Sequence, residues 1–214
     1  MKITMIILSL FSLVSLSACA FKDNKASELE TLASNYGGIY IFDKKIREEI
    51  LELEKKREEF RSKYLGSEIK VGNETHFVNF SYLKKKFPQI LSNGCKYYRS
   101  DYRYKGKADF NFKDKPEFAY YEDQFKAYMG EENYKKLRPY LGMTTYYVCE
   151  GKKYPVVFDT MIDYKVKSYG LFGDEGRGFS FSSTRYTGVG GGHFHYFTNG
   201  KFIKSDEKYT GQSY

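Results

Sequence analysis

The chain has 214 residues, of which 41% are hydrophobic and 29% are charged, and its formal net charge is +8. This balance excludes a disordered chain and is typical of a globular protein. It also contains 22 Tyr and 18 Phe but no Trp. Tyrosine buries a large ring while keeping its hydroxyl in water, so this content predicts amphipathic strands in a β-rich fold or an aromatic recognition surface.

The first segment of the chain has the layout of a secretory signal peptide. Lys2 precedes an apolar run from Ile3 to Leu16, which is shorter than the about 20 residues of a membrane-spanning helix. The residues Leu16-Ser17-Ala18-Cys19 resemble the lipobox of bacterial lipoproteins. That resemblance implies that the Cys19 thiol carries diacylglycerol, as in these palmitate-bearing proteins, and that cleavage precedes it. An ordinary signal peptide with a chance cysteine is the alternative.

The same resemblance implies a place in the cell envelope. In enteric bacteria an Asp after the lipidated cysteine retains a lipoprotein in the inner membrane, whereas this chain has Ala20. We therefore expect an outer-membrane anchor. The body is expected in the periplasm, and exposure on the cell surface is the alternative. Removal of residues 1–18 leaves 214 − 18 = 196 residues and a net charge of +7. We expect a lipidated N-terminus and short tether over 19–35, followed by a single domain over 36–214.

Two further cysteines remain if lipid occupies Cys19. Cys95 and Cys149 are expected to form a disulfide in an oxidising compartment. The bridge would close a loop of 149 − 95 + 1 = 55 residues, counting both cysteines. The chain-entropy relation gives a stabilisation of about 4 kcal/mol for such a loop. Two buried thiols are the alternative, because cysteine is also a common core residue.

Helices are expected mainly in the first two-thirds of the chain. The clearest helix begins after Asp43, a capping residue, and carries apolar residues at spacings of three and four. This apolar stripe consists of Ile46, Ile50, Leu53, Phe60 and Tyr64. Other helices are expected over 26–34, 81–87 and 120–141, the last of them broken near Gly130.

Strands dominate from Met143 onward. The expected strands cover 68–71, 75–80, 96–104, 145–149, 153–158, 161–169, 179–186, 193–197 and 201–204, and the expected loops cover 105–116, 171–177 and 188–192. The short apolar segment 39–42 is either a further strand or a packed link. Turn signals at Glu150-Gly151 and Asn199-Gly200 predict hairpins. The predicted fold class is α+β, in which helices of the N-terminal two-thirds pack on a mainly antiparallel sheet formed largely by the C-terminal third.

His193 and His195 follow the glycine run 188–192. Side chains alternate along a strand, so the two imidazoles share one face and could begin a zinc site. Such a site needs a third ligand, for which the candidates are His76, Asp159, Asp163, Asp174 and Glu175. The competing interpretation, which we prefer, is that both rings pack among Tyr and Phe on the sheet. No other cofactor is expected.

The sequence contains no nucleophile elbow, zinc-protease helix or cysteine metal knuckle, so no residue is assigned a catalytic role. A basic body favours acidic partners, either an anionic envelope component or an acidic protein. No nucleic-acid-binding motif is found, and a nucleic-acid partner is not expected.

These observations predict a membrane-anchored envelope lipoprotein that acts as a non-enzymatic binding protein. Its profile resembles that of some bacterial immunity lipoproteins, which neutralise a toxin at the membrane. Two alternatives remain open. One is a metal-dependent envelope hydrolase that uses His193 and His195, and the other is a structural envelope-assembly lipoprotein.

Overall fold

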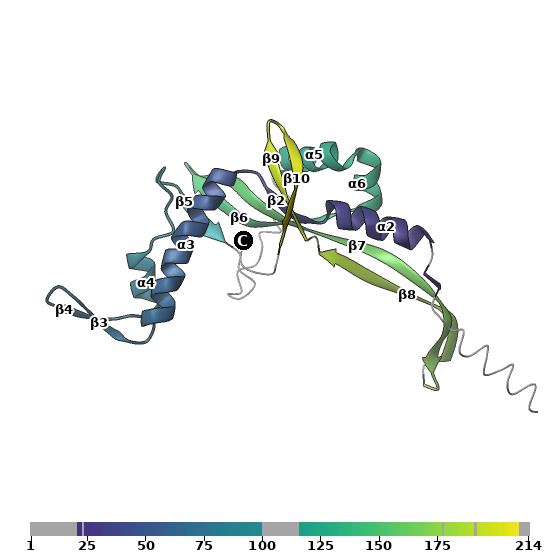
Figure 1. Ribbon diagram of the computed structural model, residues 1–214, viewed down its shortest axis with the longest axis horizontal. Coiled ribbons are helices and arrows are strands. Elements are labelled where there is room, and N and C mark those ends of the chain that lie inside the picture. The colour runs from purple at the N-terminus through teal and green to yellow at the C-terminus, as the bar shows by residue number, and fades with distance from the viewer. Residues whose placement is uncertain (1–20, 23, 100–115, 177, 191, 210–214) are drawn as a thin grey trace, which may run out of the picture.

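Figure 1 shows the computed structural model of the chain, which describes residues 21–22, 24–99, 116–176, 178–190 and 192–209. The predicted signal peptide, Cys19, the end of the strand expected over 96–104 and nearly all of the loop expected over 105–116 lie outside these residues. Within the described residues, no helix is long and apolar enough to cross a membrane.

The fold is built on one sheet whose strands run in the order β10-β9-β2-β7-β6-β5. The strands are β2 (Gly38–Ile41), β5 (Lys96–Arg99), β6 (Tyr140–Cys149), β7 (Lys152–Asp174), β9 (His193–Thr198) and β10 (Lys201–Lys208). Neighbours in this order are antiparallel, except that β2 and β9 are parallel. The predicted fold class is therefore confirmed: the protein is α+β, with a mainly antiparallel sheet formed largely by C-terminal strands.

Helices cover both faces of this sheet. On one face, α3 (Lys44–Tyr64) packs Ile50 against Ile39 and Ile41 of β2. On the other face lie α2 (Asn24–Tyr36), α5 (Phe118–Met129) and α6 (Glu131–Leu137). There Phe125 of α5 packs against Tyr40 of β2. All four residues of β2 are consequently buried, which places this short strand at the centre of the core.

Two helix boundaries have local causes. Asp43 begins α3 as predicted, because its carboxylate accepts a hydrogen bond of 2.9 Å from the Ile46 amide. The helix expected over 120–141 does break at Gly130, but it ends at Leu137, and Tyr140 already begins β6. Pro139 explains this difference, since it cannot donate a helical hydrogen bond and disfavours helical geometry in the residue before it.

A lobe projects from one end of the sheet (Figure 1). We define the lobe as residues 60–90, which contain the end of α3, the hairpin of β3 (Glu68–Val71) and β4 (Glu74–Phe77), and α4 (Phe80–Lys86). Val78 and Leu83 are buried at its base, whereas β3 and β4 have no fully buried residue. The lobe is thus attached to the sheet through α3 and has only a small hydrophobic core.

A two-stranded arm projects from the opposite end (Figure 1). We define the arm as residues 161–174 of β7 together with β8 (Gly178–Gly190), which pairs with them antiparallel. The strands expected over 153–158 and 161–169 are one continuous strand, and residues 171–174 and 188–190 of the two expected loops are strand. In the first of these loops the ribbon bends without ending, because the pairing is irregular between Tyr169 and Phe172 and Gly170 and Gly173 take φ of 157° and 117°.

The N-terminal part of the described chain is attached to the arm. Backbone pairing joins β1 (Phe21–Lys22) to Ser168 and Tyr169. The next element, α2, packs on the base of the arm, in a cluster formed by Leu29, Leu32, Ala33, Leu137, Ile162, Tyr164 and Val166. Much of the segment predicted as a tether over 19–35 therefore packs on the body.

Candidate functional site

The two predicted metal ligands lie on β9 in different surroundings. His195 is fully buried, and its ring stacks on Tyr40 with centroids 4.3 Å apart. Its Nδ1 lies 3.2 Å from the Tyr128 hydroxyl. His193 is half-buried, and its Nδ1 lies 3.3 Å from the Ser205 carbonyl oxygen. The ring of His195 is thus packed among aromatic side chains, which is the interpretation preferred from the sequence.

Burial also sets the protonation of His195. Desolvation lowers its pKa to about 4; the backbone at Gly37 opposes this shift, and Lys204 and His193 add to it. The ring is therefore neutral at physiological pH. A neutral imidazole is the form that binds metal, but it is also the form that a buried aromatic cluster tolerates.

A third ligand is the remaining requirement for zinc. Among the residues that the structure describes, no group of three or more His, Cys, Asp or Glu side chains is gathered for a metal ion. His76 lies on β4 in the lobe, where its Nε2 is 3.3 Å from a carboxylate oxygen of Glu74. A zinc site at His193 and His195 stays a prediction.

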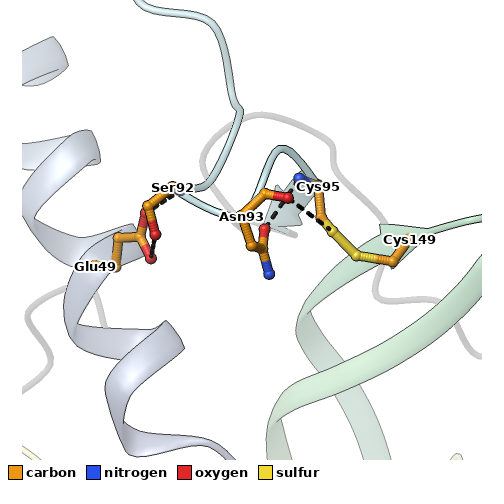
Figure 2. Close-up of a disulfide and its surroundings, with 5 residues drawn as sticks. All are labelled: Glu49, Ser92, Asn93, Cys95 and Cys149. Carbon is orange, nitrogen blue, oxygen red and sulfur yellow. Dashed lines mark hydrogen bonds between the residues drawn. A yellow bond between two sulfur atoms is a disulfide. The ribbon is translucent and has the colours of Figure 1, made fainter.

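Cys95 and Cys149 lie at disulfide distance, with their Cα atoms 5.1 Å apart (Figure 2). They join the turn before β5 to the last residue of β6. Asn93 accepts a hydrogen bond of 3.0 Å from the Cys95 amide, and Glu49 of α3 accepts one from the Ser92 amide (Figure 2). The turn 92–95 is thereby fixed to both α3 and β6.

A shallow depression where the lobe meets the sheet is the clearest candidate binding site. It has a volume of about 190 Å³ and is lined by Leu53, Lys56, Lys86, Phe87, Pro88, Ile90 and Tyr97. Sites for drug-sized ligands usually measure about 300–1,000 Å³. The depression is therefore of a size to accept one side chain of a larger partner.

Hydrogen bonds hold the floor of this depression. The Tyr97 hydroxyl donates to a Glu54 oxygen at 2.8 Å, and the Gln89 amide donates to the same oxygen at 3.3 Å. Arg57 forms an ion pair with Glu54 at 3.5 Å. Burial and then the Glu54 charge raise the pKa of Tyr97 well above its usual value, so the phenol stays protonated and keeps donating.

The rim of the depression is cationic and aromatic. The Lys86 ammonium lies 5.1 Å from the Phe60 ring centroid and 5.9 Å from that of Phe87. Exposed apolar side chains continue over the lobe at Leu65, Val71, Phe77, Phe80 and Ile90. Residues 60–90 contain six Lys or Arg and two Glu, a net charge of 6 − 2 = +4. Such a surface can bind an acidic group beside an apolar one.

Sequence reasoning did not single out this depression. The run Lys84-Lys85-Lys86 marks a basic surface, and the aromatic residues around it are visible in the sequence. Whether these residues contact Leu53 and Tyr97 depends on how α3 packs against the segment after α4. No local sequence pattern predicts that packing.

Comparison with known proteins adds no relative: no family model, curated protein or solved structure matches the chain.

Proposed function

We propose that the protein is a membrane-anchored envelope lipoprotein that acts as a non-enzymatic binding protein, and that its lobe receives an acidic protein partner. The anchor is proposed from the lipobox-like residues that end at Cys19. The observation that carries the binding proposal is the depression between Lys56 and Lys86, with its fixed floor and aromatic rim.

The chemistry of the lobe favours a protein over a small molecule. The depression is too small to enclose a metabolite, and the exposed apolar side chains around it extend over several elements. Protein interfaces combine a few buried anchors with a wider apolar and polar rim. A carboxylate of the partner would bind Lys56 and Lys86. Apolar side chains next to that carboxylate would pack on Ile90.

The position of the lobe supports this proposal. It lies at the opposite end of the longest axis from β1, which begins two residues after Cys19 in the sequence (Figure 1). A lobe that points away from the anchor is free to meet a partner in the periplasm. Neutralisation of a toxin is one form of this function, and it predicts a tight complex with no turnover.

Site-directed photo-crosslinking tests the proposal in cells that produce the full-length lipoprotein. A photoreactive amino acid at Ile90 is expected to yield one discrete crosslinked protein. The charge reversals Lys56→Glu and Lys86→Glu together should abolish that product. The matched control is Lys45→Glu with Lys201→Glu, two exposed sites outside the lobe that change the net charge equally and should leave the product intact.

Two results would overturn the proposal. The first is a crosslinked product that survives charge reversal at the depression as well as it survives the control. The second is stoichiometric zinc in the purified protein that is lost in His193→Ala together with a hydrolytic activity, since this would establish the enzyme alternative. Mass spectrometry of the same preparation reports whether Cys19 carries lipid.

A further inference from the structure

The outer part of the arm exposes large apolar side chains. Leu171 is 64% exposed and Phe181 is 82% exposed, and Tyr169 and Phe179 are also exposed. We call these four residues the arm tip. The base of the arm is covered by α2, whereas the apolar surface of the tip meets solvent. Tyr169 pairs with Ser182 and so lies on the face of the ribbon opposite Phe181, which means that both faces of the tip expose apolar side chains. Exposed apolar surface of this kind marks sites of contact with a protein or a membrane.

The position of the first described residues indicates that this contact is with a membrane. Phe21 pairs with Tyr169, so the described chain begins beside the arm tip. Cys19 is two residues earlier, and an extended chain advances at most about 3.6 Å per residue. A linker of two residues spans at most about 7 Å. A lipid on Cys19 would bring a bilayer to the arm tip.

The side chains near the tip suit a membrane surface. The Lys167 ammonium lies 5.2 Å from the Tyr169 ring centroid, and that of Lys165 lies 5.4 Å from the Tyr186 ring centroid. Tyrosine gathers at the interface of bilayers, and lysine keeps its ammonium among the headgroups while its stem covers apolar surface. The sequence Asp174-Glu175-Gly176-Arg177 is charged, which limits any insertion to a shallow depth.

We propose that the arm tip rests in the surface of the membrane beside lipidated Cys19 and holds the body in one orientation. This proposal rests on the lipid anchor proposed above. The lipid supplies most of the affinity, and the arm supplies a second contact that stops the body from rotating about a single point. The lobe, at the other end of the longest axis, is then held away from the bilayer (Figure 1).

The absence of tryptophan from the chain provides a direct test. Phe181→Trp places a single fluorophore in the arm tip, and Phe77→Trp places a matched one in the lobe, at a residue that is 56% exposed. Each full-length variant is produced as the mature lipoprotein and reconstituted into vesicles of phosphatidylethanolamine and phosphatidylglycerol. Some of the lipid carries bromine near the top of its acyl chains, where it quenches nearby tryptophan.

The expected result is a blue-shifted emission and about twofold quenching for Phe181→Trp, with neither effect for Phe77→Trp. Equal emission and quenching of the two variants would overturn the proposal. So would a blue shift of Phe181→Trp that develops with protein concentration in lipid-free detergent, because the tip would then be a contact between copies of the chain.

Two measurements on the same samples separate failure of the anchor from failure of the arm. Mass spectrometry detects the lipid on Cys19, and flotation detects the protein on the vesicles. Without the lipid mass, the anchor is wrong and the proposal for the arm falls with it. With the lipid present and the protein floating, an unquenched Phe181→Trp overturns the arm proposal alone.

Discussion

His195 is a titratable side chain placed where a charge is costly. Its ring stacks on Tyr40, and burial lowers its pKa to about 4. In the unfolded chain the pKa returns to about 6.5, so between these values the unfolded chain binds more protons than the folded one. Stability contributed by the neutral ring is fully present above pH 6.5 and is lost as the pH falls toward 4.

The measurement is the free energy of urea unfolding between pH 4.5 and 7.5. We expect the wild-type protein to lose about 2.5 kcal/mol over the acidic part of this range from His195 alone. Because carboxylates titrate there as well, the readout is the difference from His195→Phe, which keeps an aromatic ring and should show a flatter profile. Parallel profiles for wild type and His195→Phe would contradict the prediction.

Gly38 is a residue at which the backbone leaves no room for a side chain. Its φ is 148°, and a Cβ there would lie 2.3 Å from the His193 carbonyl oxygen. Its amide donates to the Thr160 hydroxyl oxygen at 2.9 Å. We expect Gly38→Ala to lower the free energy of unfolding by roughly 3 kcal/mol or more, because both the backbone and β9 must shift. Gly192→Ala, where a Cβ meets open space, should change it by less than about 0.5 kcal/mol. Similar urea midpoints for the two variants would show that the close approach is relieved at little cost.

At the scale of the element, Cys95 and Cys149 join the start of β5 to the end of β6. Replacing both cysteines by serine should lower the free energy of unfolding by about 2–4 kcal/mol, since the open chain regains the entropy of its 55-residue loop (a sequence separation of 54). Urea unfolding with and without reductant checks this. Reductant should bring the wild-type midpoint to that of the double variant and leave the variant unchanged. If the wild-type midpoint is the same with and without reductant, the prediction of a stabilising disulfide is contradicted.

Local signals predicted the elements better than their partners. The Asp43 cap, the break at Gly130 and the hairpin at Asn199-Gly200 are encoded within a few residues, and each appears where expected. The length of β7 was missed because Gly170 and Gly173 predict a loop in the sequence and serve as a bend within a strand in the fold. The depression was missed because Leu53, Phe87 and Tyr97 come from separate segments.

Strand pairing between residues far apart in the sequence is the part of the fold that could not be predicted. β2 is only four residues long, yet it lies between β7 and β9, and its parallel pairing with β9 joins residues near opposite ends of the chain. A short apolar segment carries no signal for its neighbours, because every strand offers the same backbone donors and acceptors. The burial of His195 follows from this pairing, which sets Tyr40 beside it.

The whole molecule should show a gradient of stability along its longest axis. Its middle contains β2, which is buried on both faces and paired on both edges. One end contains the hairpin of β3 and β4, which have no fully buried residue and, among the described strands, pair only with each other. A two-stranded hairpin is marginal in water, and local opening requires less free energy where few apolar contacts are lost.

Amide hydrogen exchange, followed by mass spectrometry on the full mature chain, measures this gradient. Amides of β2 are expected to exchange only through global unfolding, so their protection should match the free energy found with urea. Amides of β3 and β4 should exchange at least about a thousandfold faster, a difference of about 4 kcal/mol at 1.4 kcal/mol per factor of ten. Reduction of the disulfide lowers global stability. It should therefore accelerate amide exchange in β2 and leave the exchange rates of the β3–β4 hairpin nearly unchanged. Equal protection in the two regions would mean that the lobe unfolds with the sheet as one unit, and its apolar side chains would then need a covering that the described residues do not supply.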